Sequence, residues 1–340
     1  MKTTTPETTA TSLSGLRRTL CVGAVLACLP YLALKAIWLL GGRVGLLDPE
    51  FGTSATMHVA NALTFAMEAV ALTLAVAFVA PWGRRLPAPL VLLPMWIGTG
   101  LLGGILFALG FTAFTQVLGT PAAPSSPSPG APGSPQAAIA QWVFVVVYAG
   151  FSVLGLCLLG GFALYAAERW LRPGGWGRRL DTWPAGGATS TRRWELLAGP
   201  TVVFGVGVLV AGFAGRTSGL DWSLADGTLT IAAGLGLMAL AGGRPGGLPG
   251  LVPTVGVWVG SGALTAWGAY HFVLLAVPND LTGGAALDAS GLLLQGARIA
   301  LGGALAAGLW SVRPQVGLRP YRSAGQPQAF AVEAQSLPLL

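Results

Sequence analysis

The sequence predicts an all-α integral membrane protein with eight transmembrane helices. Of its 340 residues, 53% are apolar and only 9% are charged, whereas a soluble globular protein has about 25% charged residues. The charges gather between long apolar runs, which is the pattern of a chain that crosses a bilayer several times. The 51 glycines fit this class, because small residues let helix backbones approach closely in lipid.

Eight apolar runs reach the length of about 20 residues that a crossing requires. In chain order they lie at residues 19–42, 57–80, 88–112, 141–167, 195–215, 226–243, 250–277 and 287–312. The first run follows Arg17 and Arg18 and so resembles a signal peptide, but it is too long. It also carries Lys35 and Trp38 instead of a small-residue cleavage site. We therefore interpret it as a retained first helix.

The runs divide into two four-helix halves, residues 19–167 and 195–312. The first half contains a Pro/Ser-rich outer loop at 113–140, and a basic cytoplasmic linker at 168–194 joins the halves. We expect residues 1–18 to be a disordered cytoplasmic segment, because this segment is polar and rich in threonine. Residues 313–340 form a cytoplasmic tail.

The two halves share two short patterns. Trp96–Gly100 (WIGTG) matches Trp258–Gly262 (WVGSG), and Gly42–Asp48 matches Gly215–Asp221. Four crossings return the chain to the same side, so a true duplication would give a parallel repeat. Chance similarity between glycine-rich helices is the alternative. Glu68 has no counterpart in the second half, which favours a single asymmetric site over a symmetric pore.

Positive charges lie almost entirely on one side of the predicted helices. The opposite side has only two cations, Arg43 and Arg216. The favoured side holds the remaining cations of the connections and ends: Lys2, Arg17, Arg18, Arg84, Arg85, Arg169, Arg172, Arg178, Arg179, Arg192, Arg193, Arg244, Arg313, Arg319 and Arg322. Cytoplasmic loops carry such an excess. The sequence therefore predicts a multi-pass protein of the cell membrane with both termini in the cytoplasm. The net charge of +7 does not indicate a nucleic-acid partner.

Glu68 lies near the middle of the second predicted helix. A carboxylate at the bilayer centre is unfavourable by a few kcal/mol on insertion scales, so it usually faces the interior of a bundle and has a partner. Lys35 in the first helix and Arg298 in the last are the candidate partners.

Other polar and aromatic side chains form stripes, because residues three, four or seven apart share one helix face. The stripes are His58, Asn61, Phe65 and Glu68; Tyr31, Lys35 and Trp38; Asp288, Gly291, Gln295 and Arg298; and Gly260, Leu264, Trp267 and His271, with Tyr270 beside them. Lipid cannot satisfy polar groups, so each stripe must face inward. Together with Tyr148, these residues concentrate in the outer half of the membrane. We therefore expect a cavity there, with Glu68 at its floor.

Three classes of function fit this pattern. An intramembrane enzyme could use Glu68 as a general acid, because a carboxyl group in apolar surroundings can remain protonated at neutral pH. Aromatic walls would then stabilise carbocations. A transporter could couple the proton of Glu68 to a gradient. A structural subunit would use the charges only to lock helices together, with tryptophans and tyrosines as ordinary interface anchors.

The stretch Pro30–Gly42 (PYLALKAIWLLGG) resembles a pattern of actinobacterial multi-pass membrane proteins. In size and layout the chain is similar to integral-membrane terpene cyclases, particularly bacterial enzymes that cyclise prenylated indoles. The resemblance implies natural product biosynthesis by an isomerase or lyase, in which a membrane-embedded acid protonates a polyene or epoxide. It points to Glu68 as that acid. Asp48 and Asp221, at matching points of the halves, could fold into the cavity mouth as further catalytic residues.

The sequence gives no sign of a metal or cofactor. The three cysteines, Cys21, Cys28 and Cys157, lie inside apolar runs, and no C-x-x-C or H-E-x-x-H pattern occurs. Such cysteines are usually small buried hydrophobes. No glycine-rich phosphate loop follows a strand. We expect a lipophilic small molecule and membrane lipid as partners, while the oligomeric state is undetermined.

Overall fold

The computed structural model describes residues 6–118, 138–170, 188–216, 220–242, 247–276 and 288–312, with side chains described from Ser14 onward and not at 188–191. Within these ranges the regular secondary structure is all helical, apart from one isolated β-bridge between Leu46 and Ile139. The helices are α1 (Pro6–Leu39), α2 (Ala55–Ala77), η1 (Pro81–Arg85), α3 (Ala88–Val117), α5 (Gln141–Arg169), α6 (Ala188–Phe213), α7 (Leu220–Gly242), α8 (Leu251–Ala276) and α9 (Ala289–Val312).

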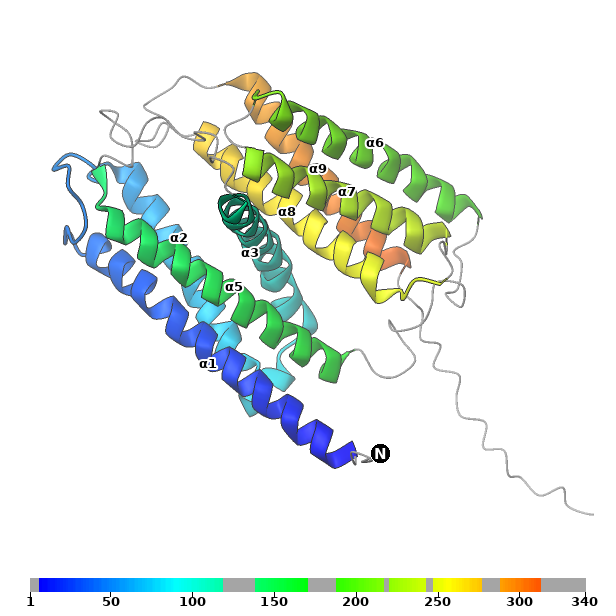
Figure 1. Cartoon of the computed structure of the whole chain (residues 1–340), viewed down its shortest axis with the longest axis horizontal. Helices are drawn as coiled ribbons and strands as arrows, with labels where there is room; N and C mark the ends of the chain where they lie inside the picture. Colours follow the sequence, from blue (N-terminus) through cyan, green and yellow to red (C-terminus); the bar gives the residue numbers. More distant parts are fainter. Residues whose placement is uncertain are drawn as a thin grey trace, which may run out of the picture.

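Eight of these helices are long and apolar enough to cross a membrane. This confirms the predicted all-α membrane architecture and the predicted number of helices. The helices cluster in two groups, α1, α2 and α5 on one side and α6 to α9 on the other (Figure 1). Helix α3 lies between the groups and packs more extensively on α7 and α8 than on α2. The first four-helix half is therefore not a self-contained bundle, because its third helix joins the second half.

Several predicted helix boundaries are wrong. Helix α6 begins at Ala188, inside the predicted linker, and not at 195, while α3 ends at Val117, inside the predicted outer loop, and not at 112. Helix α1 begins at Pro6, so residues 6–18, which we expected to be disordered, are helical. Helix α7 begins at Leu220 rather than near residue 226. Asp221 fits in its first turn because an acidic side chain is favourable at a helix N-terminus. Asp226, at which the predicted span 226–243 began, therefore lies inside the helix. The expected tail 313–340 and most of the outer loop and the linker lie outside the described residues.

Helices α3 and α8 meet at the two WxGxG patterns, which were noticed in the sequence only as a repeat. A Cβ atom at Gly100 would lie 2.2 Å from the backbone carbon of Gly262, and a Cβ at Gly262 would lie 2.4 Å from the carbonyl oxygen of Trp96. The indole Nε1 of Trp96 donates a hydrogen bond to the Ser261 hydroxyl at 3.0 Å. Glycine at both positions therefore brings two backbones into direct contact, which joins the two halves.

Helices α1 and α6 end in the same way, which bears on the second sequence match. Gly41 and Gly215 both have positive φ, 84° and 65°, and each is followed by a backbone hydrogen bond that closes a Schellman motif, from Gly42 N to Ile37 O at 2.8 Å and from Arg216 N to Ala211 O at 2.9 Å. The structural equivalent of Gly215 is thus Gly41 and not Gly42. The predicted pairing of Asp48 with Asp221 is wrong, because Asp48 lies in a loop and Asp221 in α7.

Candidate functional site

Glu68 is buried within the first group of helices. It lies on α2 and is 6% exposed. The Cys28 side chain of α1 lies beside its carboxyl group. One carboxyl oxygen, Oε1, is buried and has no hydrogen-bond partner. A buried polar atom without a partner is unfavourable unless the group is neutral or something else binds it.

Neither predicted cation pairs with Glu68. Lys35 is buried, and its Nζ donates to Asn61 Oδ1 at 2.6 Å. Asn61 lies two turns from Glu68 on the same face of α2, which is about 10 Å along the helix axis. It binds the ammonium group before that group can reach the carboxylate. Among the described residues no cation forms an ion pair with Glu68, so its expected pairing with Lys35 or Arg298 is wrong.

Lys35 is also held by aromatic rings of its own helix. Its Nζ lies 5.1 Å from the ring centroid of Tyr31 and 5.0 Å from that of Trp38. These distances are typical of cation–π contacts. The predicted stripe of Tyr31, Lys35 and Trp38 is therefore a real cluster, and the Trp38 indole fixes the end of α1 by donating to the Val44 carbonyl at 2.8 Å.

Three tyrosines connect the Glu68 region to the second half. Tyr31 packs edge-on against Phe151 of α5 at 4.9 Å between centroids and lies close to the Thr64 side chain. It lies close enough to Glu68 and to Tyr270 of α8 to interact with them electrostatically. Tyr270 in turn interacts with Tyr148 of α5. Tyr148 and Tyr270 are each 44% exposed, so both side chains lie at the surface of the bundle.

A second polar cluster lies in the other half. Arg298 of α9 donates a hydrogen bond to Asp226 of α7 at 2.6 Å, and their side chains are only 11% and 20% exposed. His271 lies near this pair. The ring centroid of Trp267 is 5.9 Å from that of His271 and 5.2 Å from that of Trp222. The predicted α8 stripe therefore reaches this ion pair through His271.

The remaining predicted residues have other positions. His58 is exposed, with its Nδ1 3.1 Å from the Ser54 carbonyl. Asp48 accepts a bond from the Glu50 amide at 2.9 Å in the loop after α1, while Asp221 accepts one from Thr112 of α3 at 3.2 Å. Phe65 and Gln295 are half-buried. Both aspartates thus have local structural partners, and their predicted catalytic role stays a prediction.

Cys28 and Asp226 are the main residues that the sequence analysis missed. Cys28 lies one turn before Tyr31 and two turns before Lys35 on α1, so helical spacing placed it on the polar stripe. It was overlooked because we treated the cysteines as small hydrophobes. Asp226 was missed because it fell at the edge of a predicted span. The predicted span began at Asp226 itself, whereas α7 begins at Leu220.

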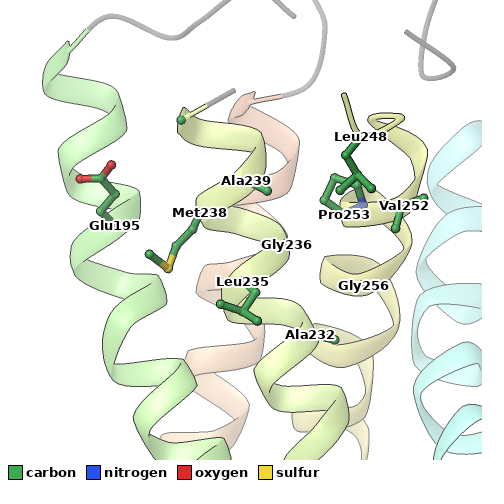
Figure 2. Close-up of a pocket in the computed structure, with 11 residues that line it drawn as sticks. Glu195, Ala232, Leu235, Gly236, Met238, Ala239, Leu248, Val252, Pro253 and Gly256 are labelled. Atoms are coloured by element: carbon green, nitrogen blue, oxygen red, sulfur yellow. The ribbon is translucent and has the colours of Figure 1, made fainter. Parts of the chain in front are cut away.

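A hollow of about 590 Å³ lies at the other end of the second half. Its walls come from α6, α7 and α8 and the turn before α8, and Glu195 stands at one side of it (Figure 2). Its lining residues are Glu195, Ala232, Leu235, Gly236, Met238, Ala239, Gly242, Leu248, Val252, Pro253 and Gly256. This hollow does not include Glu68 and is not the predicted one. The cavity expected above Glu68 stays a prediction.

No protein-family model, curated protein or solved structure matches this chain.

Proposed function

We propose that the protein is an intramembrane enzyme that cyclises a prenylated lipophilic substrate, with Glu68 as the acid that starts the reaction. The observation that carries the proposal is the buried Glu68 carboxyl group, which has an unpartnered Oε1 and no cation in an ion pair with it among the described residues. An ionised carboxylate in such a place would lose its hydration without compensation. A protonated carboxyl group is neutral and can donate its proton.

The surroundings of Glu68 suit a cationic intermediate. Tyr31 lies close to the acid and packs against Phe151, and aromatic faces attract cations. Proton transfer from Glu68 to a substrate alkene would form a carbon–hydrogen bond and a carbocation, and ring closure would move the cation. Loss of a proton to the Glu68 carboxylate would then release the product and restore the acid. The reaction is an isomerisation and requires no co-reactant.

The surface at Tyr148 and Tyr270 would admit the substrate. Both residues are strongly exposed although they interact with one another, and they come from the two different groups of helices. A lipophilic molecule entering between these groups would meet Tyr31 next and then Glu68. Exclusion of water from such a site would protect a carbocation from quenching.

A proton-coupled transporter is the second candidate. It is favoured by the two groups of helices that α3 joins (Figure 1), since alternating access usually moves one bundle against another. In that case Glu68 would still bind and release a proton, but the substrate would leave unchanged. A non-catalytic membrane scaffold would require neither step.

The test uses the full chain in nanodiscs with geranylated and farnesylated indoles. The wild type should convert one of these to a cyclic isomer of equal mass, separated by chromatography and identified by NMR. Glu68→Gln should lose at least about a hundredfold in rate, the usual contribution of a general acid. Glu195→Gln, an exposed carboxylate on α6, is the matched control and should retain the rate. Unchanged turnover in Glu68→Gln would refute the proposal, and proton-dependent uptake without conversion would favour the transporter.

A further inference from the structure

The Asp226–Arg298 cluster contains buried polar atoms that the protein leaves unused. The Arg298 side chain donates to Asp226 through one terminal nitrogen, but its Nε is buried without a partner. Gln295 lies one turn away on α9, and its Oε1 is buried and also unpartnered. Each such group is unfavourable by about 1–3 kcal/mol when it has no partner. One donor and one acceptor, three residues apart on α9, are thus left without a partner.

The packing of α8 against α9 keeps these two atoms away from lipid. A Cβ at Gly268 would lie 3.2 Å from the Cβ of Arg298 and 3.3 Å from the backbone carbonyl oxygen of Gln295. Glycine therefore lets α8 lie directly on the turn that carries both side chains. Trp267 and His271 flank this contact on α8, and Trp222 packs on Trp267 from α7. The unpartnered pair consequently lies in an aromatic, enclosed environment.

The charges already present in the cluster favour a neutral ligand. Asp226 already balances the guanidinium group of Arg298, so a ligand carboxylate or ammonium group would bring an uncompensated charge into a buried place. A neutral hydroxyl group fits better, because it has one donor and two acceptor lone pairs. It can accept from Arg298 Nε and donate to Gln295 Oε1 at the same time. An ether, an alkene or a ketone can satisfy at most one of them.

We infer that Gln295 and Arg298 bind the hydroxyl group of a neutral lipophilic alcohol. The site would hold the polar end of the ligand in the second half of the protein, while its apolar part reaches toward Tyr270 and the first half. The inference rests on the proposed function for the lipophilic nature of the ligand. It adds the class of the polar group and the residues that recognise it.

The experiment measures equilibrium binding of tritiated farnesol to the full chain in phosphatidylcholine nanodiscs. The saturable part of the binding should be displaced by unlabelled farnesol but not by farnesene, the hydrocarbon without a hydroxyl group. Gln295→Met keeps the shape of the side chain and removes the acceptor, and it should weaken binding roughly tenfold, which corresponds to one hydrogen bond. Gln116→Met, at an exposed position of α3, is the matched control and should leave the Kd unchanged.

A second variant covers the case in which Gln295→Met misfolds. Arg298→Lys keeps a cation for Asp226 but lacks the Nε donor, and it should weaken farnesol binding by a similar factor. The inference would be overturned by displacement with farnesene as readily as with farnesol, by no saturable binding, or by wild-type affinity in both variants. Glu68→Gln should bind farnesol normally. A wild-type protein that binds farnesol but converts none of the prenylated indoles would refute the proposed function alone.

Discussion

The contact between α3 and α8 predicts a strong difference between two glycines of the same WxGxG pattern. A Cβ atom at Gly100 would lie 2.2 Å from the Gly262 carbonyl carbon and 2.3 Å from the Ala263 nitrogen. These neighbours are backbone atoms, which cannot rotate away. The helices would have to separate by roughly 1 Å to restore ordinary contact, and such overpacking is typically unfavourable by about 1–3 kcal/mol.

Gly98 provides the control because it lies half a turn away and has open space around it. A Cβ there would meet nothing within 4 Å. Gly98→Ala should therefore gain helix propensity, up to about 1 kcal/mol, without a steric penalty. Gly100→Ala gains the same helix propensity, so the two alanine variants should differ in free energy of unfolding by the steric penalty alone, about 1–3 kcal/mol, with Gly100→Ala the less stable.

The assay is unfolding in mixed micelles, in which the mole fraction of sodium dodecyl sulfate is raised and the helix content is followed by circular dichroism. The midpoint of Gly100→Ala should fall below that of the wild type, while that of Gly98→Ala should not. Equal midpoints for the two variants would show that α3 and α8 do not meet at these glycines. The described contact between α3 and α8, which joins the two halves, would then be wrong.

Two further predictions concern charged groups outside the Glu68 region. Asp226→Asn leaves the Arg298 cation buried and should destabilise the protein by about 3–5 kcal/mol in the same micelle assay. The double variant with Arg298→Gln should recover most of the lost stability. Simple additivity of the two changes would contradict the ion pair. Asp288 precedes α9, and hydrogen bonds from the Ser290 hydroxyl and from backbone amides of the first turn hold the pKa of its carboxyl group below its usual value. Its stabilisation of the helix start should therefore be present above the usual carboxyl pKa and disappear as the pH falls through the lowered value. Amide hydrogen exchange in the first turn should be slower in the wild type than in Asp288→Ala at neutral pH, and this difference should vanish in acid; a difference that persists in acid would refute the capping role.

The sequence was sufficient to predict the membrane class, the eight helices and most of their bounds. Long apolar runs determine these features locally, because a crossing helix satisfies its own backbone. It was also sufficient to bring Lys35 together with Tyr31 and Trp38, since these residues share one helix face. Such predictions rest on spacing within one helix.

Partners on different helices could not be predicted in the same way. Lys35 and Arg298 both seemed available to Glu68, but Asn61 and Asp226 bind them instead. That outcome depends on how each helix is rotated and how deeply it is placed, which spacing along one helix does not specify. The role of α3 as the bridge between halves was hidden for the same reason. Its glycines were visible, but the helix they face was not.

As the proposed acid, Glu68 must hold a proton inside the first group of helices. Infrared difference spectroscopy on nanodiscs at neutral pH, comparing the wild type with Glu68→Gln, measures this directly. We predict a carbonyl stretching band of a protonated carboxylic acid that is present in the wild type and missing in the variant. A spectrum that loses only carboxylate bands on this substitution would show that Glu68 is ionised and is not the proposed acid.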